Sequence, residues 1–174
     1  HVIRMALTRL EADGLVSIAP NRGATVANLS IEEAIDILYA RQALEGAAAS
    51  LAAERITDEQ LDKLEELIGR MRAALDEKKF DLYSEINVEF HGIIYDACGS
   101  KKIPEIISSL RARVVRLQFR TILLPGRNEQ SFNEHKGIYE ALRKHSPEAA
   151  EAAMKKHFES LRRALNDPYF SYMT

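Results

Sequence analysis

Hydrophobic residues recur mostly three and four positions apart along this chain, which is the spacing of amphipathic helices. The opening segment, HVIRMALTRLEADG, places its apolar side chains on one side of a helix that ends at Gly14. Two short β-prone runs follow, LVSIAP and ATVANL, and the turn-forming Asn21-Arg22-Gly23 lies between them. This pattern predicts a helix and a two-stranded hairpin within residues 1–29.

Every periodic segment from residue 30 onward is helical. Ser30 and Glu33 have the spacing of a capping box, Thr57 is an N-cap, and Ser146 precedes a proline in the first turn of the last helix. The expected helices cover about residues 31–55, 58–77, 81–98, 103–124, 128–144 and 147–166. Short loops between amphipathic helices predict a mainly α protein with an antiparallel six-helix bundle in residues 30–174.

The first 29 residues are too few to bury a core of their own. The chain also opens without a methionine, inside a helix that is already under way. We therefore expect residues 1–29 to be the C-terminal part of a larger, truncated module. Their net charge is +1, which leaves −3 on the remainder of a chain whose formal net charge is −2.

Composition narrows the class of protein. The chain has 174 residues, of which 46% are hydrophobic and 29% are charged, as in ordinary globular proteins. No apolar stretch reaches the roughly 18 residues of a membrane-spanning helix, so we expect a cytoplasmic protein with no membrane partner. The single cysteine, Cys98, excludes an internal disulfide and a thiolate zinc cluster. A metal ion would have to be bound by histidine, asparagine or carboxylate side chains.

Four polar residues on three expected helices could meet inside such a bundle. Asn87 and His91 are four residues apart and share one helix face, while His135 and His157 lie on the two last helices. Imidazole nitrogens and an amide oxygen suit zinc, nickel and related divalent ions. A lone helical histidine is more often an ordinary packed residue than a ligand, and the spacing by itself does not separate these two interpretations.

Three arginines are candidates for binding an anion. Arg41 lies in the middle of the first long helix, and Arg116 and Arg120 are four residues apart on the fourth. A guanidinium inside the bundle needs an anion and matches a carboxylate in shape. A position on the solvated surface is equally compatible with the pattern.

Residues 2–27, VIRMALTRLEADGLVSIAPNRGATVA, resemble the end of the winged helix-turn-helix domain of GntR-family transcription regulators. The recognition helix of that family has the form VREALRRLEAEGLV, and a wing with an Arg-Gly tip follows it. The resemblance implies that Arg4 and Arg9 contact phosphates or guanines of operator DNA, and that Arg22 and Gly23 at the wing tip contact its backbone or minor groove. Met5 and Thr8 depart from the family pattern.

The helical remainder resembles the FCD effector domain of the FadR subfamily, through segments such as INVEFHGIIYDACGS, NEHKGIYEAL and AAMKKHFESL. In that family an Asp-x-x-Phe-His motif and two later histidines bind a divalent metal, which implies the same role for His91, His135 and His157. Asn87 occupies the position of the aspartate. A neutral amide leaves the charge of the cation uncompensated, so we expect weaker binding of the metal and stronger binding of an anionic effector.

The resemblance implies a metabolite-responsive regulator that binds operator DNA as a homodimer. A small carboxylate would bind near the metal, zinc or nickel, and be held by Arg41 and by Arg116 or Arg120. A metal-dependent enzyme is the alternative from another class, although no general base is evident beside the histidines and no HExxH or GxSxG motif occurs. A metal-stabilised dimerisation module without an effector is the third possibility.

Overall fold

The computed structural model describes residues 1–171, apart from the side chains of Arg116 and Ser171. Its first elements are the helix α1 (Val2–Ala12) and the strands β1 (Val16–Ala19) and β2 (Gly23–Val26). The helix ends where Gly14 adopts a φ of 70° and the N–H of Leu15 donates to the Leu10 carbonyl at 2.9 Å. The strands pair antiparallel, so the expected helix and hairpin are both present.

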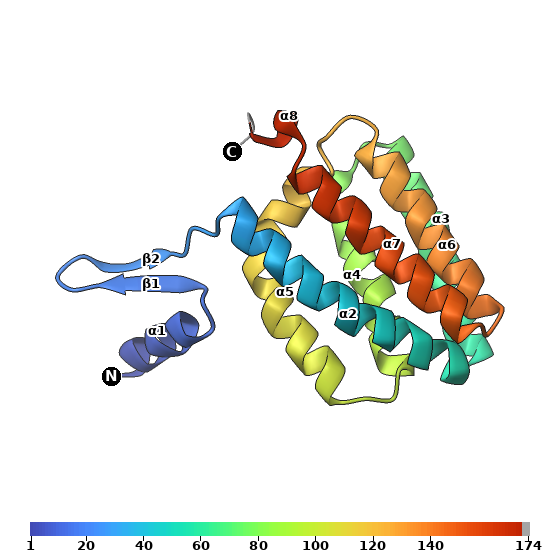
Figure 1. The fold of residues 1–174 in the computed structure, drawn as a ribbon, viewed down its shortest axis with the longest axis horizontal. Coiled ribbons are helices and arrows are strands. Elements are labelled where there is room, and N and C mark those ends of the chain that lie inside the picture. Colours follow the sequence, from blue (N-terminus) through green and yellow to red (C-terminus); the bar gives the residue numbers. More distant parts are fainter. Residues whose placement is uncertain (172–174) are drawn as a thin grey trace.

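Six long helices follow, as the periodicity predicts, and they form a bundle (Figure 1). Their ends differ by no more than a few residues from the expected ones. A short helix after the bundle, α8 (Pro168–Ser171), was not expected. The six bundle helices are α2 (Ile31–Arg55), α3 (Asp58–Asp76), α4 (Phe80–Ala97), α5 (Lys102–Thr121), α6 (Arg127–Arg143) and α7 (Pro147–Leu165).

Side-chain caps fix where these helices begin. The Ser30 hydroxyl accepts from the N–H of Glu33 at 3.1 Å, and the Glu33 carboxylate accepts from the N–H of Ser30 at 3.0 Å. Thr57 and Gln60 form the same reciprocal pair at the start of α3, and Ser146 caps α7. Because each cap satisfies backbone donors that the helix cannot pair itself, the predicted starts agree with the observed ones.

The helix and hairpin of residues 1–26 extend to one side of the bundle (Figure 1). Within the bundle α2 packs along α7, and α4 contacts α2, α3 and α5. Large apolar side chains such as Leu38, Phe90 and Phe158 are fully buried between these helices. This packing turns one face of α4, α6 and α7 toward a common interior, where the polar residues described next lie.

Candidate metal and effector site

The structure brings together the three histidines of the bundle. His91 on α4, His135 on α6 and His157 on α7 are all buried, and His135 is only 1% exposed. One ring nitrogen from each lies within 4.8 Å of the others, and the Nε2 atoms of His91 and His135 are 3.3 Å apart. Side chains that are up to 66 positions apart in the sequence thus lie next to one another in the bundle.

The other ring nitrogen of each histidine faces a fixed oxygen. His135 Nδ1 donates to the Ser131 carbonyl at 2.6 Å, and His157 Nδ1 donates to Glu134 Oε2 at 2.8 Å. His91 Nδ1 lies 3.2 Å from Glu45 Oε2, within ion-pair range but without the angles of a hydrogen bond. Such partners hold the proton on Nδ1 and leave the Nε2 lone pair available to a cation.

Burial favours the neutral form of His135 and of His157. Burial lowers the pKa of His135 and of His157 well below the usual value, and the positive charge of the neighbouring imidazoles lowers both further. With Nδ1 protonated, the facing Nε2 atoms of His91 and His135 present lone pairs to each other, an arrangement that a cation stabilises. Asn87 adds a buried Oδ1 with no hydrogen-bond partner in the described part of the chain. This donor set fits a divalent metal ion.

Two carboxylates lie beside the histidines, so the expectation that no such group stands there is wrong. Glu134 contacts His157, and Glu45 is fully buried next to His91. Burial by itself would raise the pKa of Glu45, but the Arg41 guanidinium, the nearby His91 imidazole and a hydrogen bond from Tyr95 together outweigh burial, so the pKa falls to about 2. Glu45 is therefore ionised at neutral pH.

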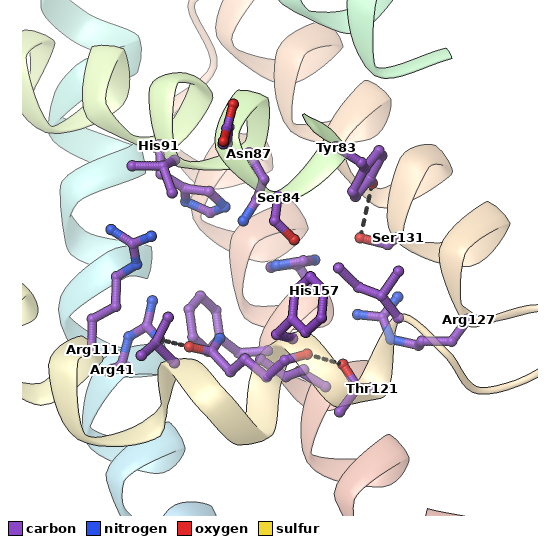
Figure 2. A pocket seen from close by; sticks show the side chains of 18 of the residues that line it. Arg41, Tyr83, Ser84, Asn87, His91, Arg111, Thr121, Arg127, Ser131 and His157 are labelled. Carbon is purple, nitrogen blue, oxygen red and sulfur yellow. Dashed lines mark hydrogen bonds between the residues drawn. The ribbon is translucent and has the colours of Figure 1, made fainter. Parts of the chain in front are cut away.

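A cavity of about 220 Å³ opens beside the triad, and Figure 2 shows its lining. It is large enough for a small organic acid. The polar groups that face it come from α2, α4, α5, α6 and α7. They include Arg41, Ser84, Asn87, His91, Arg111, Gln118, Thr121, Arg127, Ser131 and His157.

The arginines of this cavity differ in part from those expected. Arg41 lines it, is 3% exposed, and donates to Glu45 and to Gln118 Oε1 at 2.7 Å. Arg120 is half-buried and is not among the described residues that line the cavity, and the side chain of Arg116 lies outside the described part. Arg111 and Arg127 do line it.

Sequence reasoning missed Arg111, Arg127, Glu45 and Glu134. Of these, only Glu45 carries a local signal, because it is four residues after Arg41 on one helix and pairs with it at 2.5 Å. Glu134 is adjacent to His135 in sequence, yet it contacts His157 on another helix. Only packing reveals such a contact.

The residues expected to contact DNA lie on α1 and at the turn and strand start of the hairpin. Arg4 is exposed on α1, and Arg9 is exposed as well, although its Nε donates to Asp13 at 3.1 Å. Arg22 and Gly23 lie at the exposed hairpin tip, where Gly23 has a φ of 80°. The position of Arg9 near Asp13 is also that of an ordinary helix-surface ion pair.

Comparison with known proteins gives concordant results. Residues 36–160 match the FCD domain. The chain is 30% identical over 159 residues to the HTH-type transcriptional repressor RspR of Escherichia coli, covering 91% of this chain and 70% of that protein. It is 29% identical over 163 residues to the repressor GlaR of the same organism, covering 89% and 74%. The solved structure of E. coli McbR/YncC superimposes with a TM-score of 0.84 at 22% identity, over 94% of this chain and 82% of that one.

A mainly α fold of this kind, with these relatives, defines a transcription regulator. The chain belongs to the GntR family, among the members that carry an FCD effector-binding domain. The relatives are regulators and not enzymes, which confirms the choice against a metal-dependent enzyme. Within residues 1–171, no helix combines the length and apolarity needed to cross a membrane.

Proposed function

We propose that this regulator binds operator DNA as a homodimer and changes its affinity for DNA when a small carboxylate binds at a divalent metal site in the bundle. The observation that carries the proposal is the buried triad of His91, His135 and His157, whose nitrogens lie within 4.8 Å of one another. An oxygen faces the remaining nitrogen of each ring. A packed core has no need of three converging imidazoles, whereas a cation site does.

Asn87, His91, His135 and His157 would hold the ion, with zinc or nickel as the expected metals. When bound, the ion supplies a positive charge that attracts the acidic group of an effector. All four side chains are neutral ligands, so they leave that charge uncompensated. The neutral set therefore favours anionic effectors over neutral ones.

The DNA-binding side of the proposal rests on residues 1–29, as the C-terminal part of a winged helix-turn-helix. In it α1 is the recognition helix that enters the major groove, with Arg4 and Arg9 on its exposed surface. The hairpin is the wing, with Arg22 and Gly23 at its tip. Residues 30–174 would form the effector-binding and dimerisation domain, and the protein would act in the cytoplasm, where its operator lies.

One helix joins the two sites. Arg111 on α5 lines the cavity, and Arg113, two residues further on, packs against Gly14 at the C-terminal end of α1, where an added Cβ would lie 2.9 Å from its Nε. A cation at this end of a helix is also favoured by the helix dipole. A shift of α5 on effector binding would reach α1 through this contact. The effector changes DNA affinity only if it binds with different affinities to the arrangement that binds DNA and to the arrangement that does not.

Metal analysis of the full chain tests the metal site. We expect one zinc or nickel per chain in the wild type, loss of the metal in His135→Ala, and retention in Lys136→Ala, an exposed neighbour on the same helix. A folded wild type that binds neither metal would overturn the site. Operator-binding assays with and without small carboxylates then test the response. If metal binds but carboxylates leave both melting temperature and DNA affinity unchanged, a metal-stabilised dimerisation module is the better description.

A further inference from the structure

Arg127 is a buried cation with unused hydrogen-bond donors. It is the first residue of α6, directly after Gly126, whose φ of 75° redirects the chain into the bundle. Its side chain is 6% exposed and lines the cavity. Its Nε and Nη1 atoms are buried and have no hydrogen-bond partner within the described part of the molecule. Unsatisfied buried donors of a charged group are costly, so a ligand that satisfies them is strongly favoured.

The nearest carboxylate, Glu134, does not satisfy these donors. Its Oε2 lies 3.3 Å from Arg127 Nη1 but accepts its hydrogen bond from His157 Nδ1 at 2.8 Å. Glu134 therefore compensates the charge of Arg127 in part and leaves the guanidinium donors open. This arrangement differs from that of Arg41, whose donors are engaged by Glu45 and Gln118.

We infer that Arg127 is a second anion-binding group and that the effector is a dicarboxylate. One acid group would bind at the histidine triad and the other at Arg127. The inference rests on the proposed carboxylate-sensing function and adds the chemical class of the effector to it. In the view of Figure 2, Arg127 lies on the opposite side of His157 from Arg41 and Arg111, so the cavity presents positive groups at both ends.

The charge of the cavity supports two acid groups. Three arginines line it, Arg41, Arg111 and Arg127, against the buried carboxylates Glu45 and Glu134 and the exposed Glu85 of the lining. A divalent ion held by neutral ligands raises the balance from zero to two positive charges. A monocarboxylate would leave one of these charges and a dicarboxylate none. That difference favours the dianion.

Binding of matched acids to the zinc-loaded full chain tests the inference. The dicarboxylates malonate, succinate and glutarate are compared by calorimetry with the monocarboxylates propionate, butyrate and valerate, which have the same numbers of carbons. We expect at least one dicarboxylate to bind roughly 10- to 100-fold more tightly than its partner, the effect of one added charge-assisted contact.

Variants assign that preference to Arg127. Arg127→Met should abolish the preference for dicarboxylates while leaving metal content and monocarboxylate affinity near wild type. Arg127→Lys keeps the positive charge and should retain part of the preference, and it serves as the test if the methionine variant fails to fold. Arg143→Met, an exposed arginine on the same helix, is the matched control and should change nothing.

Three results would overturn the inference. Equal affinity for both members of each pair would refute the dicarboxylate while leaving a carboxylate sensor intact. Failure of all six acids to bind would refute the carboxylate effector itself as well. A parallel loss of metal and of both kinds of acid in folded Arg127→Lys would show that Arg127 is only structural.

Discussion

Glu134→Gln separates the charge of a buried carboxylate from its hydrogen bond. Glu134 Oε2 accepts from His157 Nδ1 at 2.8 Å and lies 3.3 Å from Arg127 Nη1, and both partners are buried. Glutamine can still accept from His157, but it brings no negative charge. The imidazole then becomes a weaker base toward a cation, and Arg127 loses its compensating charge.

Two magnitudes follow from these contacts. Loss of a carboxylate behind a metal-binding histidine lowers metal affinity by about 10- to 100-fold. Removing one partner of a buried ion pair costs about 3 to 5 kcal/mol, and the retained hydrogen bond places this variant near the lower value. The free energy of unfolding of a domain of this size is about 5 to 15 kcal/mol, so we expect Glu134→Gln to remain folded with a lower stability.

The assay is zinc titration against a competing chelator, together with urea unfolding of the metal-free protein. The matched control is Glu140→Gln on the same helix, because the half-exposed Glu140 lies 4.0 Å from Lys136. A pair so exposed is worth about 0 to 1 kcal/mol, so the control should change neither quantity measurably. If Glu134→Gln folds and binds zinc as tightly as Glu140→Gln does, then Glu134 does not tune His157 and the reasoning is wrong.

Three further changes test other parts of the structure. Gly14→Ala should destabilise the end of α1, because Gly14 has a φ of 70° and an added Cβ would meet Arg113 at 2.9 Å; hydrogen exchange of α1 amides would show faster opening. Ser30→Ala should lower the free energy of unfolding by about 1 kcal/mol through loss of the cap on α2, measured by urea unfolding. Because the pKa of Glu45 is lowered from 4.5 to about 2, its pairing with Arg41 should stabilise the fold above pH 4.5 and lose about 3 kcal/mol as the pH falls toward 2. Glu45→Gln should show a shallower acid dependence over that range, and an unchanged slope would contradict the assignment.

Local chemistry determined most of the secondary structure. The Ser30 and Thr57 capping boxes, Pro147 after Ser146, and the left-handed Gly14 each act through neighbours within about four residues, so helix starts and ends could be read directly. The short helix α8 was missed because its four residues are too few to show a periodic pattern.

The sequence also predicted that His91, His135 and His157 could meet inside the bundle, and the family resemblance favoured metal ligands over ordinary packed residues, a choice that the spacing left open. What it could not supply is which charged groups surround them. Arg111 and Arg127 line the cavity where Arg120 does not, although all three are arginines on helices of the bundle. Periodicity assigns a helix face, not the neighbour that this face meets.

The amino-acid sequence by itself thus determined the helices, their caps, the hairpin and the family to which the chain belongs, since all of these depend on short-range patterns. Tertiary packing alone placed Glu134 of α6 against His157 of α7, buried Glu45 beside His91, and left Arg127 facing a cavity with open donors. The reason is physical: burial and ion pairing depend on how helices distant in sequence are rotated and spaced, and those quantities come from the packing of the whole core.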